Sequence, residues 1–182
     1  MAYFMTQYAS PLGPLTLVSD GQGLAGLWIE GQKYFAATLP ETPLPRDDAP
    51  GFEAVRRWLD RYFAGENPST EGLPLYPAGN AFRQAVWACL REIPYGQVTT
   101  YGRIARQAAE RLGRAHLSAQ AVGGAVGHNP ISILIPCHRV VGANGLLTGY
   151  AGGLDKKKWL LHHEGVDTGR EELLRRLAGT KH

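Results

Sequence analysis

A cysteine, a histidine and an arginine stand next to one another at Cys137, His138 and Arg139. A thiolate is a strong nucleophile, an imidazole titrates near neutral pH, and an adjacent cation favours the thiolate form. Together these residue types could attack a soft carbon centre. The alternative is that Cys137 is a small buried hydrophobic residue, the usual role of a cysteine that follows an apolar run.

The apolar segment before the cysteine predicts how these side chains are held. Branched residues at 131, 133 and 135 are typical of a buried strand. Pro136 lacks a backbone donor, so regular strand pairing should stop there. Neighbouring side chains on an extended strand point to opposite faces. Cys137 and His138 can therefore cooperate only if the chain bends after Pro136 or if a water bridges them.

The composition is that of an ordinary soluble protein with one domain or two small ones: 182 residues, 44% hydrophobic and 19% charged. Residues 1–10 lack the regions of a signal peptide, and no apolar run reaches the roughly 18 residues of a membrane span. Two cysteines suit a reducing compartment. We therefore expect a cytoplasmic protein that does not associate with membranes.

Neither cysteine stands at a metal-ligand spacing from the histidines, so we expect no metal site and no cofactor. Nothing in the sequence indicates oligomerisation, and we expect a monomer. Charge is uneven along the chain. Residues 1–79 hold five Lys/Arg against nine Asp/Glu, whereas residues 80–182 hold fourteen against seven. The basic half favours a polyanionic partner, although a merely solvated basic surface would explain the charge equally well.

The first part of the chain predicts a small sheet followed by a helix. Residues 15–18 and 24–29 are β-prone and flank a turn cluster. The proline-rich stretch 40–50 predicts a loop, and apolar residues recur at helical spacing over 52–63. Residues 67–77 are rich in Pro and Gly, as in a linker. The predicted domains are 1–77, an α/β domain with its linker, and 78–182.

The second part predicts three helices, capped by Asn80, Thr100 and Ser118. Cys89 lies on the apolar stripe of the first helix, which indicates a structural role. Two short helices joined by a turn in a basic segment are typical of a helix-turn-helix unit. Six arginines in this segment suit phosphate contacts: Arg83, Arg91, Arg103, Arg106, Arg111 and Arg114.

The third helix, through about residue 128, consists mostly of glycine and alanine. It contains Gly123, Gly124 and Gly127, and each glycine costs about 1 kcal/mol relative to alanine in a helix interior. Close packing against another helix would explain them, and so would close approach to a nucleic-acid backbone. Residues 140–150 then predict a hairpin-like loop over the cysteine. A final helix follows, and residues from 169 predict an amphipathic appendage.

The string Pro136-Cys137-His138-Arg139-Val140, with Asn129-Pro130 before it and Gly149-Tyr150 after it, resembles the active-site signature of the methylated-DNA–protein-cysteine methyltransferases. The similarity extends from about residue 80 to 165. The resemblance implies an α+β fold, with a small N-terminal ribonuclease-H-like sheet domain and a C-terminal helix-turn-helix (winged-helix-like) alkyltransferase domain.

The resemblance also implies a function. The family repairs DNA by moving alkyl groups from the 6-oxygen of guanine, and in some cases from the 4-oxygen of thymine, to its own cysteine. The expected partner is double-stranded DNA that contains alkylated guanine. The third helix would enter the minor groove while the target base is flipped out. Because the thioether does not reverse, each molecule would act once.

The resemblance assigns the catalytic roles residue by residue. Cys137 is the nucleophile and acceptor, and His138 takes its proton, through a water in our interpretation. Glu164 orients His138 as an acid orients a base in other nucleophilic triads. Tyr101 donates a proton toward the departing guanine. Asn129 holds the turn between the third helix and the cysteine segment.

Other residues are implied in binding DNA or the base. Val140 and Tyr150 would line the base pocket, and Arg139 would make structural bonds near the site or contact a phosphate. The full set of predicted DNA- and base-binding residues is Arg103, Gln120, Ala121, Gly124, Arg139, Val140, Tyr150 and Ala151.

Two positions depart from the family pattern. Many relatives have an arginine at position 120 that fills the gap left by the flipped base, and this chain has Gln120, which can hydrogen-bond but carries no charge. Some relatives have serine at position 151, where this chain has Ala151. Three other functions stay open: a helix-turn-helix regulator without chemistry, a lesion-binding relative without transfer, and a Cys-His-Glu hydrolase.

Overall fold

A computed structural model describes residues 2–179 as two compact units. The first unit runs to residue 78 and takes in residues 130–134, and the second comprises 79–129 and the chain from 135 onward. The short segment 130–134 thus packs with the first unit although both its neighbours belong to the second. Within residues 2–179, no helix is long and apolar enough to cross a membrane.

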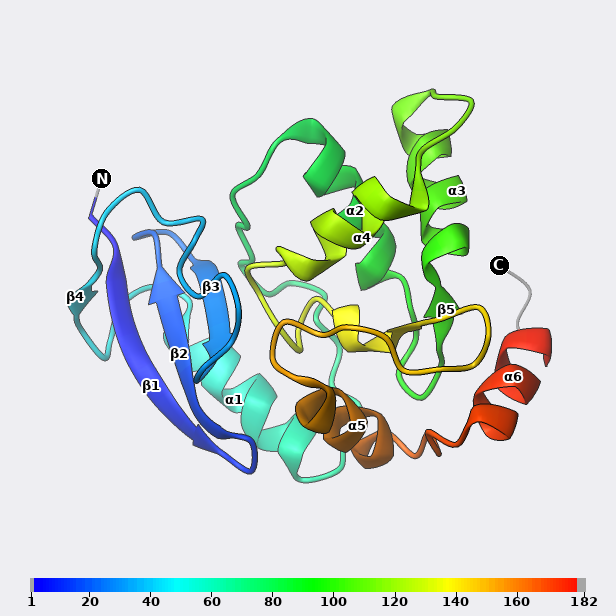
Figure 1. The fold of residues 1–182 in the computed structure, drawn as a ribbon. Helices are drawn as coiled ribbons and strands as arrows, with labels where there is room; N and C mark the ends of the chain where they lie inside the picture. The colour runs from blue at the N-terminus through cyan, green and yellow to red at the C-terminus, as the bar shows by residue number, and fades with distance from the viewer. Residues whose placement is uncertain (1, 180–182) are drawn as a thin grey trace. The chain divides into compact units, whose positions relative to one another are not determined.

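The first unit is a four-stranded sheet with one helix beside it (Figure 1). The strands β1 (Phe4–Ser10), β2 (Gly13–Ser19) and β3 (Leu24–Ile29) pair antiparallel in sequence order. Helix α1 (Phe52–Phe63) buries one apolar stripe. The predicted β-prone runs lie within β2 and β3, so these predictions are confirmed.

The prediction that 40–50 forms only a loop is wrong at two residues. Strand β4 (Leu44–Pro45) pairs parallel with β1 at the edge of the sheet. The Leu44 N–H donates to the Tyr3 carbonyl at 2.8 Å, and the Arg46 N–H donates to the Met5 carbonyl at 3.0 Å. Pro45 is tolerated because the two residues around it supply the donors of this short ladder.

The second unit begins with helices α2 (Ala81–Arg91), α3 (Tyr101–Leu112) and α4 (Ala119–Gly127). The three predicted caps are confirmed, because Asn80, Thr100 and Ser118 each accept the backbone N–H three residues later. Trp87 of α2 donates its indole N–H to the Ala125 carbonyl at 2.9 Å. This buried bond ties α2 to α4.

The apolar run before the cysteine is buried as predicted but is not a strand. Ile131 forms one isolated bridge to Leu27, and Ile133 has a φ of 73°. A positive φ bends the chain and is costly for a β-branched residue, so the ladder cannot continue. The chain then enters a 3₁₀ turn, η1 (Cys137–Arg139), which provides the bend that cooperation between Cys137 and His138 requires.

Two short strands and two helices complete the second unit. Strand β6 (Val140–Val141) follows η1 and pairs parallel with β5 (Thr99–Thr100), which leads into α3. A loop over residues 142–153 connects β6 to helix α5 (Leu154–His163), and the last element is α6 (Arg170–Gly179).

Candidate active site

The centre of the site is a buried cluster of His138, Arg139 and Glu164. The Nε2 of His138 lies 2.6 Å from Oε2 of Glu164, and both side chains have no exposed surface. Arg139 donates to both carboxylate oxygens, from Nε at 2.8 Å and from Nη2 at 3.1 Å. This bidentate contact is the geometry that best stabilises a carboxylate away from water.

The charges in this cluster follow from burial and from the arginine. Burial lowers the pKa of His138, and the Glu164 carboxylate only partly opposes that shift. Burial also opposes ionisation of Glu164, but His138 and Arg139 outweigh it and hold the pKa of this carboxyl well below its usual range. At neutral pH the imidazole is therefore neutral and the carboxylate is charged.

A neutral imidazole beside a carboxylate has one favourable tautomer. Its Nε2 carries the proton, and this N–H donates a hydrogen bond to Glu164, which leaves Nδ1 as an acceptor. Nδ1 of His138 is buried and has no hydrogen-bond partner among the residues that the structure describes. The ring is thus oriented by Glu164 and has a lone pair ready to accept a proton.

Cys137 lies at the start of the same 3₁₀ turn, and the residue as a whole is 6% exposed. Burial raises its pKa, and a hydrogen bond with Asn129, the charge of Lys157 and a hydrogen bond with Tyr150 act in the opposite direction. A thiol with a raised pKa is protonated at neutral pH, so it needs a base before it can attack. Asn129 also donates to the Ile135 carbonyl at 2.8 Å and so holds the turn.

Tyr101 is the first residue of α3, and its hydroxyl meets the loop that follows β6. The hydroxyl donates to the Gly149 carbonyl at 3.5 Å and accepts from Thr148 Oγ1 at 3.3 Å. Burial raises the pKa of Tyr101. The phenol therefore keeps its proton at neutral pH, as a proton donor must.

One residue of the site, Lys157 on α5, was missed by the sequence analysis. Its side chain is fully buried, and its Nζ donates to the Val140 carbonyl at 2.6 Å and to the Thr148 carbonyl at 2.8 Å. Burial lowers the pKa of Lys157 to about 8, and Cys137 opposes this shift. Its position three and four residues before the apolar pair Leu160 and Leu161, on one helix face, was the signal that could have revealed it.

We expect Lys157→Met to slow alkylation of Cys137 by iodoacetamide about tenfold at pH 7, because a cation near a thiol favours the thiolate. Lys157 is charged below a pKa of about 8. The difference between the two proteins should therefore shrink as the pH rises above that value. Lys158→Met, at an exposed position of the same helix, is the matched control. Identical pH profiles for the wild-type protein and Lys157→Met would contradict the role of this cation.

The predicted DNA- and base-binding residues fall into two groups. Val140 is fully buried beside the cysteine turn, Tyr150 and Ala151 are half-buried in the loop, and the α4 residues are exposed at positions 120, 121 and 124. The second group is the two arginines, whose guanidinium groups are bound by other parts of the chain. Arg103 donates to the Leu177 carbonyl at 2.7 Å, and Arg139 donates to the Ile93 carbonyl at 2.6 Å as well as to Glu164.

The glycines of α4 are not required by packing among the described residues. A Cβ added at Gly124 or Gly127 would meet nothing within 4 Å, and one added at Gly123 would lie 3.9 Å from Tyr101 Cδ1, an ordinary contact. The glycines of α4 are therefore not explained by close packing against another helix of the described chain. Close approach of an external backbone is the explanation that this geometry favours.

Among residues 2–179, no group of His, Cys, Asp or Glu side chains could hold a metal ion. The site instead combines a buried thiol, a neutral imidazole with a free acceptor nitrogen, and a carboxylate behind it. On an α+β fold with a capped, basic helical unit, this arrangement is that of a candidate thiol nucleophile with an imidazole base and an orienting carboxylate.

Comparison with known proteins identifies the family within this class. Residues 81–166 match the model of the 6-O-methylguanine DNA methyltransferase DNA binding domain, and residues 3–77 match that of its ribonuclease-like domain. The chain belongs to the 6-O-methylguanine DNA methyltransferase family. The predicted fold class, a ribonuclease-like sheet domain followed by a helical DNA-binding domain, is confirmed.

Individual relatives cover nearly the whole chain. The methylated-DNA–protein-cysteine methyltransferase of Haemophilus influenzae is 42% identical over 169 residues, which is 91% of this chain and 88% of that protein. The Shigella flexneri protein of the same name is 44% identical over 86% of this chain and 92% of its own length. The crystal structure of Mycobacterium tuberculosis OGT in complex with DNA aligns with a TM-score of 0.73 at 38% identity, covering 95% of this chain and 99% of that one.

Proposed function

We propose that this protein repairs DNA by transferring the alkyl group from the 6-oxygen of alkylated guanine to the sulfur of Cys137. One observation carries this proposal: Nε2 of His138 lies 2.6 Å from Oε2 of Glu164, and its other ring nitrogen, Nδ1, is buried in the cysteine turn without a hydrogen-bond partner among residues 2–179. Membership of the family supports it. Transfer from the 4-oxygen of alkylthymine would use the same chemistry.

The reaction needs one proton to move from the thiol to the departing base. His138 accepts the proton of Cys137, directly or through a water, and the thiolate attacks the alkyl carbon. A carbon–sulfur bond forms while the carbon–oxygen bond breaks, and its electron pair goes to the 6-oxygen of guanine. Tyr101 donates a proton to the departing guanine, so that it does not leave as an anion, and the proton held by His138 replaces the one that Tyr101 lost, by way of solvent. The thioether does not reverse, and each molecule reacts once.

The target base must leave the DNA stack to reach the cysteine. We assign α4 to the minor groove, with Gln120, Ala121 and Gly124 on its DNA side and Gln120 bonding to the orphaned partner base. Val140, Tyr150 and Ala151 would line the pocket for the flipped base. Arg103 and Arg139 would act from within the protein, since their guanidinium groups are bound there.

Three broader assignments complete the proposal. The chain acts as two domains divided near residue 78, and it works as a monomer on double-stranded DNA. It resides in the cytoplasm, which suits a protein whose two cysteines are both free thiols.

Incubation of the full chain with a duplex that contains methylated guanine tests this function. Mass spectrometry should find one adduct, equal in mass to one methylene group, on Cys137 and none on Cys89. The lesion should disappear in proportion to the protein added. A stable complex without a mass change would instead identify a non-catalytic DNA-binding protein, and repeated turnover without an adduct would identify a hydrolase.

Gly124→Ala should separate stability from activity. Because a Cβ at this exposed helix position meets nothing, the free energy of unfolding should rise by up to about 1 kcal/mol. In a duplex, the added methyl group would meet the DNA backbone, so transfer should slow by about tenfold while transfer from the free alkylguanine base is unchanged. Urea unfolding and the two transfer rates measure these effects. If Gly124→Ala transferred the alkyl group from the duplex as fast as the wild-type protein does, the placement of α4 would be contradicted.

A further inference from the structure

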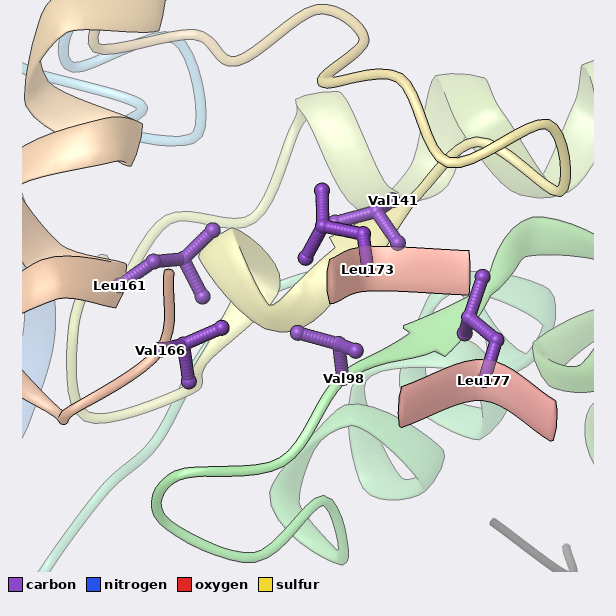
Figure 2. Close-up of a cluster of buried hydrophobic side chains, with 6 residues drawn as sticks. All are labelled: Val98, Val141, Leu161, Val166, Leu173 and Leu177. Carbon is purple, nitrogen blue, oxygen red and sulfur yellow. The ribbon is translucent and has the colours of Figure 1, made fainter. Parts of the chain in front are cut away.

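Helix α6 was predicted to be an appendage, but it contributes to the core of the second unit. Its Leu173 and Leu177 are buried in a cluster of apolar side chains (Figure 2). The other members come from β6, from the segments next to β5 and α5, and from α5 itself: Val98, Val141, Leu161 and Val166. The helix lies outside the residues matched by the DNA binding domain of the family, which end at 166.

The N-terminal turn of α6 packs against the first turn of the loop that follows β6. Arg170 Nε donates to the Asn144 carbonyl at 3.0 Å. A Cβ added at Gly145 would lie 2.7 Å from Leu174 Cγ and 2.8 Å from the Arg170 carbonyl oxygen. The loop backbone therefore touches α6 directly at this point.

The C-terminal turn of α6 is held by the first turn of α3. Arg103 Nη2 donates to the Leu177 carbonyl at 2.7 Å, which satisfies a carbonyl at the end of α6. Arg176 adds a bond from Nη1 to the Gly96 carbonyl at 3.0 Å, just before β5. Arg103 lies two residues after Tyr101, so this contact reaches the turn of α3 that carries the phenol.

These contacts link both ends of the loop to α3, one end directly and the other through α6. Tyr101 touches Thr148 and Gly149 at the far end of the loop, while α6 joins the near end, at Asn144 and Gly145, back to α3. We propose that α6 is a brace that positions residues 142–150 against the first turn of α3, and that Arg170 and Leu174 are positioning residues for alkyl transfer.

The brace matters because the proposed reaction needs fixed distances between groups on different segments. The phenol of Tyr101 is on α3, the thiol of Cys137 is on η1, and Tyr150 is on the loop. Misplacement of a catalytic group by about 1 Å can cost a factor of roughly 100 in rate. An element that holds the loop against α3 therefore affects the rate without touching the substrate. This inference rests on the function proposed above.

The double variant Arg170→Ala/Leu174→Ala tests the brace, since it removes the two side-chain contacts to the loop but leaves Leu173 and Leu177 in place. Arg175→Ala is the matched control, because that side chain is 75% exposed and pairs with Glu172 on the same helix. We expect amide hydrogen exchange over residues 142–150 to accelerate about tenfold in the double variant and not in the control. Methyl transfer from the free alkylguanine base should slow about tenfold, with duplex affinity within about twofold of wild type.

Unchanged exchange over 142–150, or faster exchange with an unchanged transfer rate, would overturn the positioning role. If the double variant does not fold, the same measurements are made on Arg170→Ala alone, because this substitution removes only an exposed hydrogen bond to Asn144. Adduct formation by the wild-type protein separates the proposed function from the proposed role of α6. If it forms no adduct on Cys137, the proposed function fails, while hydrogen exchange in the variants still decides whether α6 restrains the loop.

Discussion

Replacement of Cys137 by alanine should abolish alkyl transfer, with a loss of at least about 10³-fold measured as adduct formed per hour on a methylated duplex. The sulfur is the only atom of the proposed reaction that forms a bond to the alkyl group, so no neighbouring residue can replace it. The substitution removes one buried atom, and the protein should still fold and bind the duplex. Thermal unfolding and an equilibrium binding measurement check both points.

Cys89→Ala is the control for this experiment. Cys89 is also buried, on the apolar stripe of α2, and burial raises the pKa of its thiol. A general effect of losing a buried thiol would appear in both variants, whereas loss of the acceptor would appear only at position 137. A Cys137→Ala protein that still removes the lesion would exclude the proposed nucleophile.

Glu164→Gln should lower the transfer rate by about 10²- to 10³-fold and destabilise the protein by about 3–5 kcal/mol. The carboxylate holds the tautomer of His138 and balances the charge of the buried Arg139. A neutral amide can do neither, and Arg139 would be left as an uncompensated charge. Single-turnover kinetics and urea unfolding measure the two effects. Glu66→Gln, which breaks an exposed ion pair with Arg61, should cost less than about 1 kcal/mol and leave transfer unchanged.

Glu164→Gln should also change how the free energy of unfolding depends on pH. Because the pKa of Glu164 is lowered in the folded protein, the unfolded chain binds more protons below the ordinary carboxyl pKa of about 4.3. The stabilisation from Glu164 is therefore complete above that pH and is lost as the pH falls toward the folded pKa. In Glu164→Gln this loss is absent, so its unfolding free energy should depend less on pH between about 5 and 2. Parallel pH curves for the two proteins would show that Glu164 does not carry this linkage.

Features that depend on contacts within a few residues were predictable from the sequence. Asn80, Thr100 and Ser118 cap their helices because a short polar side chain bonds a backbone N–H three residues later. The strands β2 and β3 follow from branched and aromatic residues on either side of a turn cluster. The resemblance in turn pointed to the family, because its motif is a continuous string around Cys137.

Features that depend on distant partners were not predictable. The segment around Ile133 is buried like a strand but turns, because its partner at Leu27 is a single bridge and not a ladder. Lys157 sits in a run of three lysines, and only its spacing of three and four residues from Leu160 and Leu161 sets it apart from its exposed neighbour, without naming the groups it contacts. Arg103 belongs to a basic helix, yet its guanidinium is bound to the end of α6.

The sequence by itself determined the helix starts and the family, and it placed a candidate nucleophile next to a candidate base, since each of these depends on neighbouring residues. The resemblance also pointed to the contact of Glu164 with His138, and only the tertiary structure decided that Lys157 lies buried beside the cysteine turn and that α6 contacts the loop over residues 142–153. The physical reason is that burial and charge pairing are properties of the packed chain. A side chain's pKa and partners depend on the segments that fold against it, which can be any distance away in sequence.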